Sequence, residues 1–201
     1  MDRKERLKKA MKDEAEVLNR NADRIDYEVM SKITDILGSV KKKGKKVVLA
    51  GCGTAGQAAK RIAHTLCVVE VPSFFLSPAD SIHGGMGAMQ EGDVLILISK
   101  SGNTQEILNY LPAAQKKGLT VIGVTENENS KLGRAADIVL KIKIDREPDC
   151  WGIVSSASTL AFISAFDAMA FAIMEENGYT KEEFYLIHTG GGVGDILRKE
   201  L

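Results

Sequence analysis

Residues 99–104 (SKSGNT) bring hydroxyl groups and a glycine directly behind an apolar segment. That segment, 94–98 (VLILI), is typical of a strand buried on both faces, and helical periodicity resumes with residues 105–108 (QEIL). The turn between them therefore falls at a helix N-terminus. Free backbone N–H groups and the positive end of the helix dipole favour an anion at such a position. The pattern predicts a phosphate site.

The side chains of this turn allow two interpretations. Ser99, Ser101 and Thr104 can donate neutral hydrogen bonds to a phosphate, which suits a ligand that must leave again. The same spacing allows Asn103 to cap the helix, with Glu106 completing a capping box. Capping and anion binding are compatible, so both remain open.

A second glycine-containing turn, 51–56 (GCGTAG), follows the first apolar strand and satisfies the dinucleotide pattern G-x-G-x-x-G. Against nucleotide binding, the second strand ends at Leu76 without the acidic residue that would take a ribose hydroxyl, and Asp80 comes too late. We expect these glycines to let the backbone and Thr54 approach a small sugar phosphate. Cys52, close to a helix N-terminus, is either a nucleophile or a small residue buried in a tight turn.

The elements that must position these turns alternate regularly between strand and helix. We expect strands at 46–50, 73–76, 94–98, 120–124 and 138–144, and helices at 55–66, 105–117 and 130–135. Five strands with intervening helices predict a three-layer α/β/α sandwich with a parallel, flavodoxin-like sheet. Ligands of such sheets bind beyond the carboxyl ends of the strands, so both turns should face one crevice.

The first forty residues carry apolar side chains three or four positions apart throughout. This predicts one long helix or two abutting helices, with 19–21 as the break. We divide the chain into an N-terminal helical segment, 1–43, and an α/β domain, 44–201. The apolar stripe is longer than a small sheet can cover, so we expect the segment to pack partly on its own domain and partly on another subunit.

Composition narrows the classes of partner and cofactor. Lys plus Arg and Asp plus Glu are 27 each, so no overall field favours nucleic acid or anionic membrane; the run 41–46 (KKKGKK) is interpreted as a solvated helix end. The longest apolar stretch, 160–174, is interrupted by Ser164 and Asp167. Three widely spaced cysteines indicate a reduced, cytoplasmic protein, and no histidine spacing predicts a metal. We expect no membrane contact and no cofactor.

Several motifs together resemble the SIS, or sugar isomerase, domain. Residues 99–104 are similar to its phosphate loop, S-x-S-G-E-T. From about Lys45 to Leu197 the chain is more similar to the isomerase domain of bacterial arabinose 5-phosphate isomerases. Segments 78–87, 147–152, 155–159 and 187–194 are similar to P-x-E-A-x-H-G-D-L-G, E-A-C-P-L-G, P-T-S-S-T and S-H-P-G-G-A-L-G, respectively. Usual members continue into a pair of CBS modules, which we do not expect here.

The resemblance implies an isomerase that interconverts an aldose phosphate and a ketose phosphate through a cis-enediol. It places Glu147 at the position of the base, and we expect partial desolvation near Trp151 to raise the pKa of Glu147. His188 matches a histidine for ring opening or proton transfer, often contributed across a subunit interface, and His83 matches a further site histidine. The implied substrate-binding residues are Gly51, Gly53, Thr54, Ser99, Lys100, Ser101, Asn103, Thr104, Ser156 and Ser158. The expected assembly is a homo-oligomer, with a tetramer favoured.

The chain departs from the family pattern where residues 54–55 replace the usual K-S and where Asn103 replaces the glutamate of the phosphate loop. The sugar is therefore open, and other isomerases such as a 3-hexulose 6-phosphate isomerase remain alternatives. From another class, SIS domains also serve as non-catalytic phosphosugar sensors. A sensor needs the phosphate loop but has no need of Glu147 and His188.

Overall fold

Short β-branched and leucine-rich segments form the centre of the molecule because both of their faces are covered by helices. The structure is a computed structural model and describes residues 1–201. Its strands are β1 (Val47–Gly51), β2 (Ser73–Phe75), β3 (Val94–Ile98), β4 (Thr120–Thr125) and β5 (Ile138–Lys141). All pairings are parallel, in the order β2-β1-β3-β4-β5. The predicted flavodoxin-like α/β sheet is confirmed.

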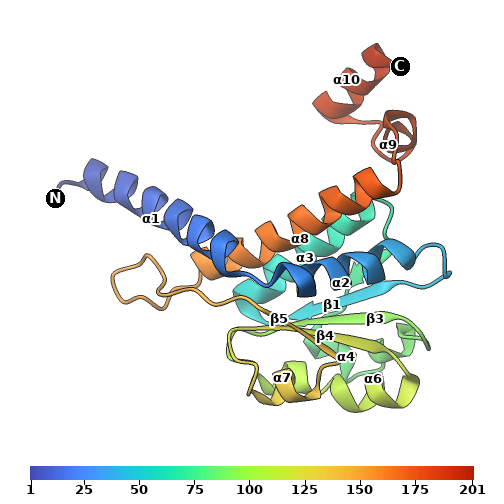
Figure 1. Cartoon of the computed structure of the whole chain (residues 1–201), viewed down its shortest axis with the longest axis horizontal. Coiled ribbons are helices and arrows are strands. Elements are labelled where there is room, and N and C mark those ends of the chain that lie inside the picture. The colour runs from blue at the N-terminus through green and yellow to red at the C-terminus, as the bar shows by residue number, and fades with distance from the viewer.

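Helices cover the two faces of this sheet in separate layers (Figure 1). One face is covered by α2 (Tyr27–Ser39), α3 (Gly53–Val68) and α8 (Ala157–Glu176), together with the end of α1 (Arg3–Arg24). The other face packs against α5 (Gln105–Leu108), α6 (Leu111–Lys117) and α7 (Lys131–Ala135). Alternate residues of each strand enter the two cores, as Val47 and Val48 do.

Two expected helices differ from prediction. The N-terminal break lies at Ile25 and Asp26, not at 19–21, because the Asp26 carboxylate caps α2 by accepting from the N–H groups of Glu28 and Val29, at 3.0 Å each. The expected helix 105–117 is divided into α5 and α6. Pro112 at the start of α6 has no N–H to donate, so it cannot continue α5.

The turn elements beside the sheet are α4 (Pro78–Ser81) and the 3₁₀ helix η1 (Gly85–Ala88), which follow β2. At the end of the chain, α9 (Lys181–Ile187) and α10 (Gly191–Glu200) pack against each other. Figure 1 shows this pair projecting beyond the C-terminal end of α8, while the first turns of α1 project from the other side. Both projections carry exposed apolar side chains.

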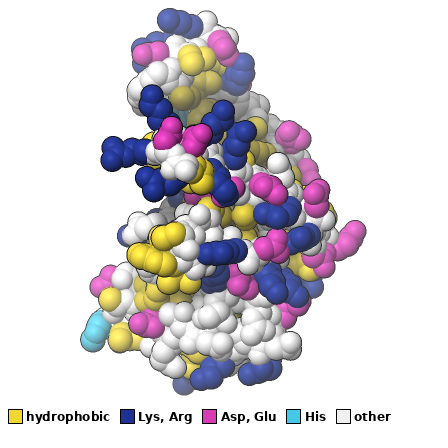
Figure 2. Space-filling view, turned by 90° about the vertical axis from the view of Figure 1, so that its left-hand side faces the viewer, with side chains coloured by type: hydrophobic (Ala, Val, Ile, Leu, Met, Phe, Trp, Pro, Cys, Tyr) yellow, Lys and Arg dark blue, Asp and Glu magenta, His cyan; other side chains and the backbone are white.

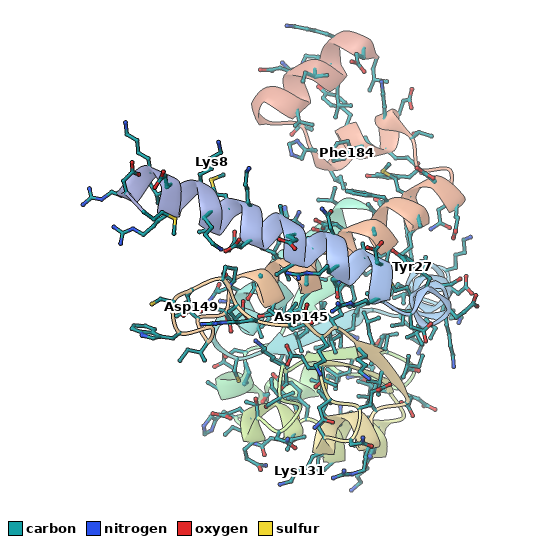
Figure 3. The ribbon with its side chains drawn as sticks, turned by 60° about the vertical axis from the view of Figure 1, so that its left-hand side comes forward. Lys8, Tyr27, Lys131, Asp145, Asp149 and Phe184 are labelled. Atoms are coloured by element: carbon teal, nitrogen blue, oxygen red, sulfur yellow. The ribbon has the colours of Figure 1, made fainter.

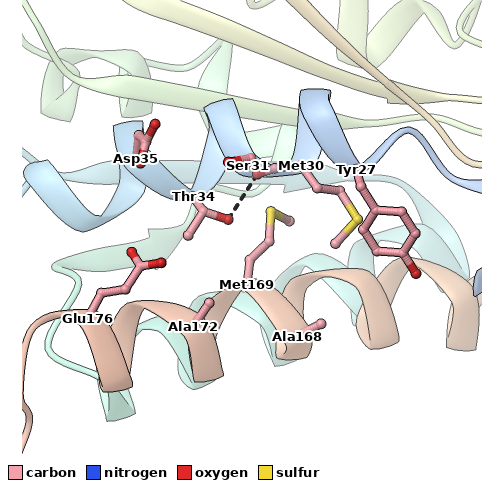
Figure 4. A pocket seen from close by; sticks show the side chains of 9 residues that line it. All are labelled: Tyr27, Met30, Ser31, Thr34, Asp35, Ala168, Met169, Ala172 and Glu176. Carbon is pink, nitrogen blue, oxygen red and sulfur yellow. Dashed lines mark hydrogen bonds between the residues drawn. The ribbon is translucent and has the colours of Figure 1, made fainter.

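Helix α8 is the one helix long and apolar enough, by length and composition, to cross a membrane. Its hydrophobicity also has a use inside the fold, since nine of its residues are buried and it packs on α1, α2 and α3. Between α2 and α8 a groove remains, with Met30 and Met169 at its floor and Tyr27 at one end (Figure 4). Asp35 and Glu176 are at the other end.

Candidate functional site

Two turns meet at the carboxyl edge of the sheet because their strands are neighbours in register. Gly51, the last residue of β1, pairs with Ile98, the last residue of β3. The turns that follow therefore border one cavity of about 420 Å³. Its lining comprises Cys52, Thr54, Ala55, Ile98, Ser99, Lys100, Ser101, Thr104, Glu126 and Ser155. The predicted common crevice is present.

The 99–104 turn is held by its own hydroxyl groups. Ser99 is buried, and its Oγ lies 2.9 Å from Oγ1 of Thr104 while accepting from the N–H of Gly102 at 3.2 Å. Gly102 has a φ of +66°, and a Cβ there would collide with Oγ of Ser130. Only glycine fits this position, so the turn is fixed against the start of α7.

Asn103 does not cap the following helix, and the capping interpretation is wrong. The N-cap is Thr104, whose side chain makes no capping bond. The Asn103 amide instead donates to the carbonyl of Ser101 at 3.2 Å and accepts from the N–H of Lys131 at 3.1 Å. Its contact is therefore with α7, and it does not line the cavity. The first turn of α5 carries no side-chain cap, which leaves its N–H groups available to an anion.

The 51–56 turn depends on a close approach of backbone to backbone. A Cβ on Gly51 would lie 2.7 Å from the carbonyl oxygen of Ala55, and one on Gly56 would lie 2.7 Å from that of Gly51. Gly53, with a φ of +56°, starts α3. Burial, and secondarily the charge of Glu106, raises the pKa of the Cys52 thiol, which disfavours the nucleophile interpretation.

Glu147 is buried beside the cavity and is surrounded by donors. Lys100 Nζ lies 2.8 Å from its Oε1, and the Ser158 hydroxyl donates to the same oxygen. Its Oε2 accepts from the N–H groups of Ser156 at 3.1 Å and Ser158 at 3.3 Å. The predicted residues Ser156 and Ser158 thus bind Glu147, and the cavity is lined by Ser155.

The expected cause and direction of the Glu147 pKa shift are wrong. Trp151 is 73 % exposed, so it does not shield the carboxylate from water. Burial does raise the pKa of the Glu147 carboxyl, but hydrogen bonds from Lys100 and Ser158 outweigh it and hold the pKa below its ordinary value. Glu147 is therefore a stable carboxylate at neutral pH.

Glu126, one residue beyond β4, is a cavity residue that the sequence reasoning missed. Its Oε1 is buried without a hydrogen-bond partner and lies 3.7 Å from Lys100 Nζ. Burial raises the pKa of Glu126, with the Lys100 ammonium opposing part of the shift. Its place after a central strand, at the ligand-binding edge of a parallel sheet, was the available signal.

The two predicted histidines lie apart from the cavity within one chain. His83 is exposed in the turn before η1. His188 ends α9, where it packs on Phe184 with ring centroids 5.2 Å apart and a buried, unpartnered Nδ1. Figure 3 shows Phe184 on the C-terminal pair, remote from Asp145 and Asp149, which flank Glu147 in sequence.

The length of α8 explains this separation. Glu147 binds the first residues of α8, whereas α9 and His188 follow its last turn. The 20 residues of α8 span about 30 Å, so His188 cannot reach its own cavity.

Comparison with known proteins matches residues 41–173 to the SIS domain. The arabinose 5-phosphate isomerase KdsD of Pseudomonas aeruginosa is 38% identical over 152 residues, which are 76% of this chain and 47% of that protein. GutQ of Escherichia coli K12, also named an arabinose 5-phosphate isomerase, is 35% identical over the same shares. The chain thus spans about half the length of the curated relatives it matches.

Two solved structures are similar over nearly the whole chain. A proposed sugar-phosphate isomerase of Listeria monocytogenes is 40% identical, with a TM-score of 0.90 over 94% of this chain and 100% of the other. A protein of Escherichia coli CFT073, solved in complex with arabinose 5-phosphate, is 31% identical, with a TM-score of 0.87 over the same shares.

Proposed function

Because this chain belongs to the SIS domain family, we propose that it is a sugar phosphate isomerase that interconverts an aldose phosphate and a ketose phosphate. Arabinose 5-phosphate and ribulose 5-phosphate are the first pair to test. The relatives named as arabinose 5-phosphate isomerases and the similar chain solved with arabinose 5-phosphate support this choice.

The observation that carries the proposal is the chemistry of the cavity. Its phosphate loop supplies Ser99, Ser101 and Thr104, and directly beside them Lys100 stands between two carboxylates. A sensor could hold a phosphosugar with the hydroxyls and backbone alone. An ammonium group and carboxylates gathered at one cavity are what proton transfer next to a carbonyl requires. The enzyme is therefore favoured over the sensor.

The reaction that suits these groups passes through a cis-enediol. A carboxylate removes the C2 proton of the open-chain aldose, the C–H electrons form a C1=C2 double bond, and the carbonyl electrons move to O1. A proton passes from O2 to O1, the carboxylic acid returns its proton to C1, and C2=O2 forms. A positive side chain near O1 stabilises the negative charge that develops there. No atom or electron is gained or lost overall.

We place His188 in the site of a neighbouring subunit. It is remote from its own cavity, and its ring nitrogen Nδ1 has no partner within the chain. Apolar side chains exposed on α1, on α9 and α10, and on the loop before α8 would be covered in such an assembly. They comprise Leu7, Met11, Trp151, Ile153, Leu186, Ile187 and Ile196. Figure 2 shows hydrophobic side chains open on one side of the molecule. We propose a cytoplasmic homotetramer.

Proton NMR in deuterium oxide tests the activity directly. With arabinose 5-phosphate we expect loss of the C2 proton signal and growth of ribulose 5-phosphate. Ser101→Asp, which sets a negative charge in the phosphate loop, should abolish both, whereas Ser31→Asp on the exposed surface of α2 should not. If no pentose or hexose phosphate exchanges a proton although one binds, the sensor replaces the isomerase.

A further inference from the structure

Lys100 lies between two carboxylates that differ in their access to the cavity. Its Nζ is 2.8 Å from Oε1 of Glu147 and 3.7 Å from Oε1 of Glu126. The Glu147 side chain is 0 % exposed and is absent from the cavity lining, while that of Glu126 is 23 % exposed and forms part of it. A substrate in this cavity meets Glu126 and Lys100 before it could meet Glu147.

The Glu147 carboxylate has no acceptor position left for a substrate proton. A carboxylate offers about four lone-pair positions. Four donors occupy them here: Lys100 Nζ and the Ser158 hydroxyl at Oε1, and the N–H groups of Ser156 and Ser158 at Oε2. Proton abstraction by Glu147 would require at least one of these buried bonds to break.

Glu126 has the opposite properties. Its Oε1 accepts no hydrogen bond although water does not reach it. Its backbone is nevertheless fixed, because its N–H donates to the carbonyl of Lys100 at 3.0 Å, and the Thr125 hydroxyl donates to that carbonyl at 3.0 Å. The loop after β4 is thus tied to the phosphate loop. A carboxylate with a vacant acceptor is held at a defined place in the cavity wall.

We propose that Glu126 is the catalytic carboxylate that takes the substrate proton, and that Glu147 is a positioning residue that holds Lys100. The inference rests on the proposed isomerase and assigns its central step. The Glu126 carboxylate accepts the proton from C2 as the C1=C2 bond forms, and the resulting carboxylic acid delivers it to C1. The Lys100 ammonium remains charged throughout and faces the oxygen that gains electrons, because Glu147 anchors it from behind.

Parallel variants of the two glutamates distinguish the roles. We would measure C2 proton exchange and ketose formation for wild type, Glu126→Gln, Glu126→Asp and Glu147→Gln, with Glu128→Gln as the matched control. Glu128 is exposed two residues further on and pairs with Lys141. Binding of inorganic phosphate by each variant reports whether the fold and the phosphate loop are intact.

Glu126→Gln should lower kcat about 10³-fold and remove C2 exchange while leaving phosphate affinity unchanged. Glu126→Asp should recover part of kcat, and Glu128→Gln should match wild type. Glu147→Gln should raise KM and lower kcat but retain slow C2 exchange, since its role is indirect. The assignment is overturned if Glu126→Gln still exchanges the C2 proton, or if only Glu147→Gln abolishes it. A wild type that exchanges no proton overturns the proposed isomerase, and with it this assignment.

Discussion

The ammonium group of Lys100 lies 2.8 Å from the buried carboxylate of Glu147, and this pair joins the phosphate loop after β3 to the loop after β5. The two residues are 47 positions apart in sequence. Their contact fixes the side chain of a loop that must also release a ligand. Buried ion pairs add little net stability but are costly to break, so this one is better understood as a device for positioning than as a source of stability.

Removing the Glu147 carboxylate should destabilise the protein strongly at neutral pH. Glu147→Ala leaves the Lys100 charge and the Ser158 hydroxyl without their buried partner, at a cost of about 3–5 kcal/mol. Urea unfolding at pH 7 measures it. The surface variant Glu128→Gln should change the free energy of unfolding by less than about 0.5 kcal/mol. A similar small change for Glu147→Ala would contradict the described pair.

The contribution of Glu147 should also depend on pH in a defined direction. Its folded-state pKa is held below the unfolded value of about 4.3, so its stabilisation is complete above that value and is lost as pH falls through the folded pKa. The difference in unfolding free energy between wild type and Glu147→Gln should be greatest near pH 7 and shrink below about pH 4. A difference that grows on acidification would exclude this linkage.

Glu126 should show the reverse stability effect, because burial raises the pKa of its carboxyl. The charged groups that face it are Lys100, from the loop after β3, and Glu147, from the loop after β5. Its charged form is disfavoured in the folded state, so its favourable contribution exists below the unfolded pKa and is lost as pH rises through the folded pKa. Glu126→Gln should therefore be no less stable than wild type at pH 7. Thermal unfolding at pH 5 and pH 7 checks this, and a clear loss of stability at pH 7 would refute it.

Gly102 should tolerate no side chain. Gly102→Ala places a Cβ into Ser130 and requires a left-handed conformation that costs about 1–2 kcal/mol before the clash is counted. We expect weaker phosphate binding by calorimetry and a lower melting temperature. Gly87→Ala is the matched control, since a Cβ at that position meets nothing within 4 Å. Equal behaviour of the two variants would show that the turn is not fixed in this way.

If His188 serves a neighbouring cavity, two inactive variants should restore activity when refolded together. His188→Ala retains an intact cavity, and Ser101→Asp retains an intact histidine. In a two-fold pair, about half of the assemblies are mixed and each has one intact site, so about a quarter of wild-type activity should return. Mixing Ser101→Asp with Lys100→Gln, both altered in the same cavity, should restore none. Failure of the first mixture would leave His188 without a role across the interface.

Much of the fold follows from the chain locally. Alternating apolar strands and helical stretches, together with right-handed crossovers, lead to a parallel sheet whose first and third strands are neighbours. The two glycine-containing turns then meet at its carboxyl edge without further assumptions. The limits of each element depended on finer contacts, such as the carboxylate of Asp26 at the start of α2 and the missing N–H of Pro112.

The site was determined by sequence only up to the identity of its phosphate loop. Tertiary structure alone brought Lys100, Glu126 and Glu147 together from three loops, and it alone buried Glu147 among donors while leaving Glu126 in the cavity wall. The same structure separated His188 from its own cavity by the length of α8. The physical reason is that periodicity and turn chemistry act between neighbours in the chain, whereas burial, charge pairing and pKa depend on which groups the completed fold brings within a few ångströms.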